Sequence, residues 1–303
     1  MNTSGWLLRE GEARTSVFHL GRYCSEWKAS TYPYGKPSFH IVLGGECWLD
    51  LFNQHPRTFL EKGDILFFFK NLPFVLASSP EADINDLPRK PMLKIEAPSV
   101  DATDLLCGFL QPHTLSGQLL FALLPDIFLI KNGDSVNNKL HALFELLQIE
   151  VNLASDEQSP IITHLTDAIL HYIISESSSL YDLDINLLNA ANDESIARLM
   201  IAIVDSPESA WSLDDMAHFS HMSRSTFIRR MLKATSYTPN MVLSKLRIYV
   251  ALNLLYRGIK TEEIYGHVGY ESVSGFYQAF KRVTGTAPGD YISSALFGKS
   301  NYC

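Results

Sequence analysis

The sequence predicts an α+β fold, in which a small β-barrel precedes a helical segment and an all-α C-terminal region. Three observations predict it. Short apolar stretches broken by turn residues occupy positions 38–77, apolar residues follow helical spacing from about residue 137 onward, and one helical pattern occurs twice within about the last hundred residues. We therefore expect three units, at residues 1–136, 137–205 and 206–303.

The β-rich unit is predicted from apolar stretches that alternate with turns. Residues 38–51 are apolar on either side of a Gly-Gly pair, which predicts a hairpin, and residues 60–76 predict two more strands. Residues 105–110 and Ile127–Ile130 predict further strands, and the Pro-rich, acidic residues 80–104 predict a mobile loop. Strands this short and closely spaced are typical of a small barrel or sandwich.

The middle unit is predicted to be helical because its apolar residues recur every three or four positions. The two sets with this spacing are Leu140, Leu143, Phe144, Leu147 and Val151, and then Ile161, Leu165, Ile169 and Tyr172. Such stripes either fill the core of one chain or pack against a second copy in a homodimer, and the sequence leaves both readings open.

Charge is distributed unevenly along the chain. The net charge is −8, but residues 206–303 hold 11 Lys and Arg against 7 Asp and Glu, a net +4. Residues 1–205 hold 14 against 26, a net −12. A basic unit suits contact with phosphates and an acidic unit is repelled by them, so we expect nucleic acid to meet the C-terminal unit only.

We expect a reduced, cytoplasmic protein without a membrane segment. The first residues lack the basic start and apolar core of a secretory leader. The longest apolar run, residues 65–69, ends at Lys70 and is too short to span a bilayer. The four cysteines show no C-x-x-C spacing, which disfavours a disulfide framework.

The repeated pattern predicts two helix-turn-helix units. The first copy begins at Met216 and the second at Ile264, and in each copy twelve residues separate a phenylalanine from a proline: Phe227 from Pro239, and Phe276 from Pro288. The helix predicted between the copies, Pro239–Tyr256, has a length of about 27 Å, close to the roughly 34 Å between successive major grooves. Such a chain is suited to read two adjacent segments of DNA.

Each unit offers a second helix whose outer side is polar. We expect Ser223, Arg224, Ser225, Thr226, Arg229 and Arg230 in the first copy, and Ser272, Ser274, Gln278, Lys281 and Arg282 in the second, to face double-stranded DNA. Long donors reach base edges, and short hydroxyls at a helix N-terminus hold phosphate. Two ordinary solvated helix faces are the alternative, which the matched copies in a basic region disfavour.

The stretch from Trp211 to Tyr291 resembles the DNA-binding domain of the AraC/XylS family of bacterial transcription regulators. The matching residues are Ala217, Met222-Ser223-Arg224-Ser225, Phe227, Pro239, Leu246-Arg247, Ala251, Leu254-Leu255, Ile264, Val268-Gly269-Tyr270, Phe276, Phe280-Lys281, Gly285 and Pro288. The departures are Leu232, Ser236, Tyr265 and Gly266. The resemblance implies a regulator, more often an activator, that binds promoter DNA and RNA polymerase and is not an enzyme.

The N-terminal unit resembles the cupin-like effector domain of some family members, through Gly63-Asp64-Ile65, the strand through Phe67, and Pro73. Metal-binding cupins gather several His and one Glu. Here His40 and Glu46 are two candidates, and Phe74 follows Pro73 where a ligand His often lies, so we expect no metal and no cofactor. A cupin metalloenzyme fused to a DNA-binding domain is the alternative that this pattern disfavours.

Two kinds of signal are compatible with the N-terminal unit. Cys24 and Cys107 resemble in position the cysteines of cupin-type members that respond to reactive chlorine or other oxidants, and Arg22 beside Cys24 favours the thiolate. We expect a reversible thiol switch, against the alternative of two buried, inert cysteines. A small apolar ligand is the second possibility, lined by Trp48, Phe52, Phe67, Phe69 and Phe74 unless these rings only fill the core.

Overall fold

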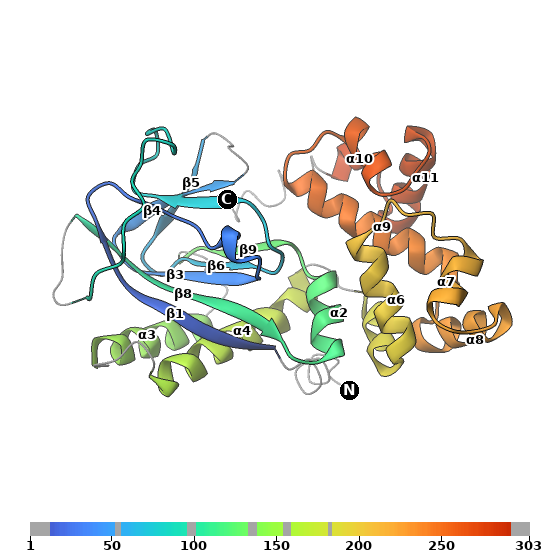
Figure 1. Ribbon diagram of the computed structural model, residues 1–303, viewed down its shortest axis with the longest axis horizontal. Helices are drawn as coiled ribbons and strands as arrows, with labels where there is room; N and C mark the ends of the chain where they lie inside the picture. The colour runs from blue at the N-terminus through green and yellow to red at the C-terminus, as the bar shows by residue number, and fades with distance from the viewer. Residues whose placement is uncertain are drawn as a thin grey trace.

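The computed structural model describes residues 13–51, 56–95, 101–132, 138–153, 159–180 and 184–291. Two β-sheets and the helices against them form the N-terminal part, and helices alone form the C-terminal part (Figure 1). The α+β class and the order of its parts are confirmed. Within the described ranges, no helix is both long enough and apolar enough to cross a membrane.

The strands form two antiparallel sheets. The five-stranded sheet has the order β1 (Ala13–Cys24), β8 (Ala102–Pro112), β3 (Ser38–Gly44), β6 (Ile65–Phe68) and β9 (Ile127–Ile130). The four-stranded sheet has the order β2 (Lys28–Ala29), β7 (Phe74–Ala77), β4 (Glu46–Leu51) and β5 (Thr58–Glu61), and a short 3-10 helix, η1 (Tyr32–Tyr34), follows β2. Across the described strands the sheets do not close into the expected barrel, and they remain two separate layers.

The expected hairpin around Gly44-Gly45 is wrong, because β3 and β4 lie in different sheets. The chain crosses between the sheets at Gly45, which has a φ of 69°. A Cβ atom there would overlap the carbonyl oxygen of Ala102, so only glycine fits this corner. The apolar residues on each side of the glycine pair predicted the two strands but not their partners.

The five-stranded sheet is buried on both faces. Along β6, Leu66 and Phe68 belong to a core between the two sheets, whereas Ile65 and Phe67 belong to a second core on the opposite face. Side chains alternate along a strand, so a strand covered on both sides has an uninterrupted apolar sequence. This is the reason for the aromatic run that ends at Lys70.

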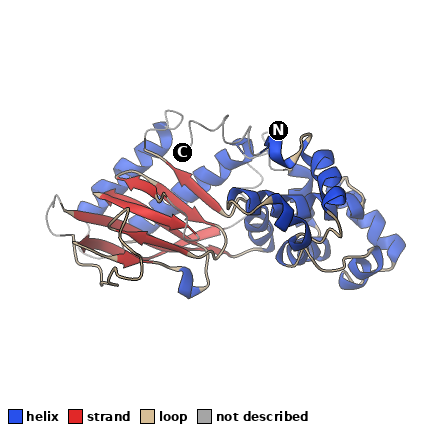
Figure 2. Ribbon diagram, turned by 90° about the horizontal axis from the view of Figure 1, so that it is seen from above, coloured by secondary structure: helices blue, strands red, loops and turns tan. Residues whose placement is uncertain are grey.

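Helices cover the outer face of the five-stranded sheet (Figure 2). These are α2 (Leu115–Leu123), α3 (Asn138–Leu153) and α4 (Pro160–Leu180). The backbone N–H of Thr15 in β1 donates to Asp167 Oδ1 in α4 at 2.6 Å, and the Thr15 and Thr166 hydroxyl oxygens lie 2.6 Å apart. Amphipathic spacing predicted α3 and α4 but not α2, because most residues of α2 are buried and no polar face marks its period.

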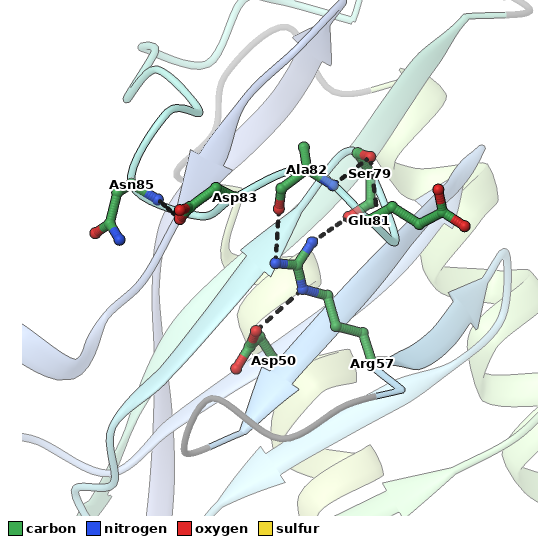
Figure 3. Close-up of polar contacts among 7 residues, drawn as sticks. All are labelled: Asp50, Arg57, Ser79, Glu81, Ala82, Asp83 and Asn85. Carbon is green, nitrogen blue, oxygen red and sulfur yellow. Dashed lines mark hydrogen bonds and ion pairs between the residues drawn. The ribbon is translucent and has the colours of Figure 1, made fainter.

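A buried arginine fixes the loop that follows β7. Arg57 donates from Nε to Asp50 at 3.0 Å, and from its two Nη atoms to the carbonyl oxygens of Ser79 at 2.7 Å and Ala82 at 2.8 Å (Figure 3). The start of the region expected to be a mobile loop is therefore held in place. Its end, from Ala102, belongs to β8, and residues 96–100 lie outside the described residues.

The C-terminal helices match the sequence prediction closely. After a connection of α5 (Ile185–Leu188), η2 (Asn189–Asn192) and α6 (Glu194–Asp205) come α7 (Leu213–Phe219), α8 (Arg224–Thr235), α9 (Pro239–Tyr256), α10 (Thr261–His267) and α11 (Val273–Thr284). The Ser212 side chain accepts from the backbone N–H of Asp215, whose carboxylate accepts from the Ser212 N–H in return. This reciprocal cap fixes the start of α7.

The two helix-turn-helix units differ in what they pack against. Phe227, Met231 and Leu246 lie in the same continuous core as α2, α6 and the outer face of the five-stranded sheet. The second unit has a core of its own, around Ile264 and Phe276. The first unit is therefore coupled by packing to the N-terminal part, whereas the second is joined to it through α9.

Candidate nucleic-acid interface

The second helices of the two units, α8 and α11, begin and end alike. Each has 12 residues, and each begins at a serine cap whose side chain accepts a backbone N–H, Ser223 from Thr226 and Ser272 from Gly275. Each ends at a left-handed residue, Ser236 with a φ of 60° and Gly285 with a φ of 83°. The two helices thus present equal lengths from equal starting points.

Buried aromatic and sulfur side chains fix the rotation of both helices. Phe227 and Met231 of α8 and Phe276 and Phe280 of α11 each have 0% of their surface exposed. The pairs occupy equivalent positions, 49 residues apart in the sequence. Because the same side of each helix is held inward, the opposite side is determined for both.

Four equivalent positions in each helix point outward and are exposed. We call Ser225, Arg229, Leu232 and Lys233 the first reading face, and Ser274, Gln278, Lys281 and Arg282 the second reading face. Each member of the second follows its counterpart by 49 residues, with spacing i, i+4, i+7 and i+8. Lys233 and Leu232 are not among the residues that the sequence predicts at the DNA. The position of Lys233, a cation four residues after Arg229, is the signal that could have predicted it.

Four of the five remaining residues expected at the DNA lie at the helix N-termini. Ser223 and Ser272 are caps, and the Ser223 hydroxyl also donates to the Thr226 hydroxyl at 3.0 Å. Arg224 lies 3.6 Å from Asp214, and both side chains are more than 60% exposed, so this pair is weak. Hydroxyl groups and a cation at a helix N-terminus are suited to hold a phosphate.

Arg230 departs from the sequence prediction. Its Nε and Nη2 atoms donate to the two carboxylate oxygens of Asp193 at 2.8 and 2.7 Å, and Asp193 is the residue that caps α6. The equivalent residue of α11 is Ala279, which is 3% exposed. Arg230 is therefore directed toward α6 and away from the first reading face. Helical spacing alone did not show which polar residues an adjoining helix would engage.

The turns of the two units have the same left-handed step. His221 in the first turn has a φ of 55°, and Gly269 in the second has a φ of 75°. A Cβ atom on Gly269 would overlap Nη2 of Arg247 and would lie 2.5 Å from the carbonyl oxygen of Pro207. Arg247 Nε itself donates to that oxygen at 2.9 Å, so the second turn, α9 and the connection after α6 are locked together.

Comparison with known proteins agrees with an N-terminal β-rich part followed by two helix-turn-helix units. Residues 6–176 match the family model described as Cupin, and residues 216–294 match the one described as Helix-turn-helix domain. The chain is an AraC/XylS-family regulator. An uncharacterized HTH-type transcriptional regulator of Haemophilus influenzae is 27% identical to it over 278 residues, covering 89% of this chain and 91% of the relative.

Two further proteins resemble this AraC/XylS-family regulator. The RCS-specific HTH-type transcriptional activator RclR of Escherichia coli is 26% identical over 207 residues, covering 68% of this chain and 73% of RclR. The crystal structure of ToxT from Vibrio cholerae O395 is 14% identical with a TM-score of 0.37, covering 94% of this chain and 97% of ToxT. The family establishes a DNA-binding transcription regulator with a cupin N-terminal part, and not an enzyme.

The two candidate metal ligands of the cupin part do not converge. His40 is buried between the sheets, where its Nδ1 lies 3.1 Å from Cys107 Sγ, whereas Glu46 is exposed at the start of β4. Burial lowers the pKa of His40 to about 3, so the ring is neutral at neutral pH. Among the described residues, no group of three or more His, Cys, Asp or Glu is placed to hold a metal ion.

The regulator's two candidate redox cysteines are far apart. On the antiparallel pair β1 and β8, Cys24 lies opposite Ala102 and Cys107 lies opposite His19. Five residues of strand therefore separate the two cysteines, about 17 Å at about 3.3 Å per residue. A disulfide requires Cα atoms within about 7 Å, so this conformation does not permit a direct Cys24–Cys107 bond.

The cysteine environments also differ. Burial raises the pKa of the Cys107 thiol to about 12, and Cys47, which the sequence did not single out, is also buried, with its pKa raised by the same cause. Cys24 is half-buried. Arg22, the cation expected beside it, makes a bidentate pair with Asp104, at 2.6 Å from Nε and 2.8 Å from Nη2. Cys303 lies outside the described residues.

The aromatic residues expected to line one apolar pocket lie in different places. Phe67 and Phe69 belong to the core beneath the helices, whereas Phe74 lies between the sheets and stacks on Phe68 at 4.0 Å. Trp48 is half-buried and contacts Phe59 at a ring distance of 5.6 Å. Phe52 lies outside the described residues. Phe67 and Phe69 fill one core and Phe74 another, which contradicts a single shared lining.

Proposed function

We propose that this regulator is a sequence-specific transcription activator whose two reading faces occupy successive major grooves of promoter DNA. The observation that carries the proposal is the duplicated set of outward residues, equal in position and exposed in the full chain. No described residue of the acidic N-terminal part covers either face. Figure 1 shows α8 and α11 beside α9, away from the two sheets.

The chemistry of the faces suits base reading. An arginine such as Arg229 pairs in two places with guanine, and a glutamine such as Gln278 pairs in two places with adenine. Lys233 lies one turn beyond Arg229, at the border of the first face, where cations meet phosphates. Arg282 lies at the equivalent border of the second face, and its Nη2 donates to the Ser244 hydroxyl of α9 at 3.2 Å. The 18 residues of α9 span about 27 Å, which keeps the two readers within one groove repeat of each other.

The binding test uses the full chain and three alanine variants. Operator duplexes would be selected from a random pool, and their affinities measured at one fixed salt concentration. Arg229→Ala and Gln278→Ala should each weaken binding by about 1–3 kcal/mol and relax the base preference at one position. The control is Arg198→Ala on α6, which removes an arginine that is 62% exposed and paired with Glu194. Unchanged affinity in both reading-face variants would overturn the proposal.

The N-terminal part is proposed to act on the readers through charged contacts across the junction. Arg257 at the end of α9 pairs with Asp126 before β9, and Lys245 of α9 pairs with Asp184 at 2.8 Å. Lys70, partly buried nearby, has its pKa lowered by burial. A signal that moves the strands or α2 alters these contacts, and so shifts the population of DNA-competent conformations. This route of transmission is consistent with the core that the first helix-turn-helix unit shares with the N-terminal part.

Thiol oxidation is the signal we propose. What supports it is the similarity to RclR, which carries the name RCS-specific activator, and the half-buried Cys24. Because a direct bond to Cys107 is not within reach, oxidation would begin at Cys24 alone, and Cys107 would respond only after β1 and β8 move. Reporter induction by oxidant in Cys24→Ala and Cys107→Ala variants tests this. Full response in both variants would refute it.

RNA polymerase is proposed as the partner of the activator on DNA.

A homodimer is proposed through α3. Leu146, Ile149 and Leu153 of α3 are 53%, 55% and 76% exposed and share one side of the helix at spacing i, i+3 and i+7. A two-fold copy would cover this stripe with itself. Because more than half of Ile149 is exposed, Ile149→Glu should abolish a dimer in sedimentation without loss of fold. An unchanged sedimentation coefficient would refute this interface.

A further inference from the structure

One residue of the first reading face differs in chemistry from every other member of the two faces. Leu232 is 42% exposed, and its counterpart in the second reading face is Lys281. Helical spacing places it three residues after Arg229 and seven after Ser225, on the same outward side of α8. The other seven members of the two faces are polar or charged. The leucine therefore lies where a base edge would be met.

The major groove offers one apolar group to such a side chain. Base edges there carry donors and acceptors, except for the C5-methyl group of thymine. We propose that Leu232 reads this methyl group, so that the half-site bound by α8 contains a thymine beside the guanine read by Arg229. The inference rests on the proposed function, because it assumes that α8 enters the groove with its first reading face.

The two half-sites should therefore differ. The first would be recognised by one long donor, Arg229, and one apolar contact, Leu232. The second would be recognised by Gln278, which suits adenine, and by Lys281, which suits guanine. Two helices of equal length and equal rotation would in this way read unequal sequences, which fixes the direction of the regulator on its promoter.

The expected size of the effect follows from the methyl group. Removing one buried methyl or methylene group costs about 0.8 kcal/mol, which corresponds to about a fourfold change in Kd. Replacing thymine by deoxyuridine removes this methyl group and leaves every hydrogen-bonding atom of the base in place. The substitution isolates the contact on the DNA side, as Leu232→Ala does on the protein side.

The experiment begins with operator duplexes selected by the full chain. The half-site of α8 is the one whose base preference relaxes in Arg229→Ala. Each thymine in it is then replaced in turn by deoxyuridine, and Kd is measured for the unaltered chain and for Leu232→Ala. We expect about a fourfold loss at one thymine for the unaltered chain, and equal affinity for both duplexes in Leu232→Ala. Leu232→Met, which keeps an apolar side chain, should retain the discrimination.

One control variant and the pattern of outcomes separate this inference from the proposed function. Lys281→Ala should weaken the second half-site but leave the deoxyuridine effect in the first unchanged. If the unaltered chain tolerates deoxyuridine at every thymine of that half-site, or if Leu232→Ala keeps the full discrimination, the methyl contact is refuted while sequence-specific binding stands. If no duplex is enriched by the selection, the proposed function fails and this inference fails with it.

Discussion

Two adjacent arginines of α8 should behave oppositely when each is replaced by alanine. Arg230 makes a two-point charged contact with Asp193, whose side chain is 14% exposed, whereas Arg229 is exposed on the first reading face. Arg230→Ala removes two charge-assisted hydrogen bonds and leaves a largely buried carboxylate with fewer donors. Since the arginine itself is 42% exposed, solvent screens part of the loss, and we expect a cost of about 1–2 kcal/mol in stability.

The assay compares urea unfolding with operator binding for both variants. Arg230→Ala should lower the urea midpoint and leave the base preference unaltered, whereas Arg229→Ala should leave the midpoint nearly unchanged and relax one base position by about 1–3 kcal/mol. Asp193→Asn keeps a side chain that can cap α6, so its combination with Arg230→Ala isolates the ion pair. Relaxed base preference in Arg230→Ala, with the urea midpoint unchanged, would refute the assignment of Arg230 to α6.

Three further outcomes are expected. Gly269→Ala should lower the melting temperature by an amount equivalent to at least about 1 kcal/mol. Gly269 has a φ of 75°, and a Cβ atom there would overlap Arg247 and lie 2.5 Å from the carbonyl oxygen of Pro207. The control Gly266→Ala, where a Cβ atom would meet no atom within 4 Å, should raise the melting temperature. At pH 8 iodoacetamide should alkylate Cys24 before Cys107, because burial raises the Cys107 pKa to about 12 and keeps it a thiol; equal rates by mass spectrometry would count against this. Asp126→Asn should change basal reporter activity without oxidant, and unchanged activity would argue against transmission at the junction.

Local sequence patterns were sufficient for much of the C-terminal part. Serine caps, buried phenylalanines and a proline at a fixed distance recur in both units, and α9 was predicted at the bounds it has. Each of these signals acts within a few residues of the chain, through capping hydrogen bonds and the 3.6-residue period. The same period also places six of the eight reading-face residues outward.

Long-range partners were not predictable in the same way. Gly44-Gly45 marked the boundary between two strands, but the chain crosses between sheets there and brings Gly45 against Ala102, which lies more than fifty residues away. Cys24 and Cys107 are expected to act as a pair because their positions resemble those of cysteines in oxidant-responsive family members, but the register of β1 with β8 separates them. Strand register is set by many contacts at once, none of which is written in the neighbouring residues.

The sequence by itself determined that this protein carries two matched helix-turn-helix units on a basic region, because helix period and capping are local properties. Only the tertiary structure decided that Arg230 pairs with Asp193 at the start of α6, and that the first unit shares its core with the N-terminal part. It also decided that Cys24 and Cys107 lie far apart on β1 and β8. Each of those facts depends on which distant surfaces are buried together, and burial is a property of the packed chain rather than of any short segment.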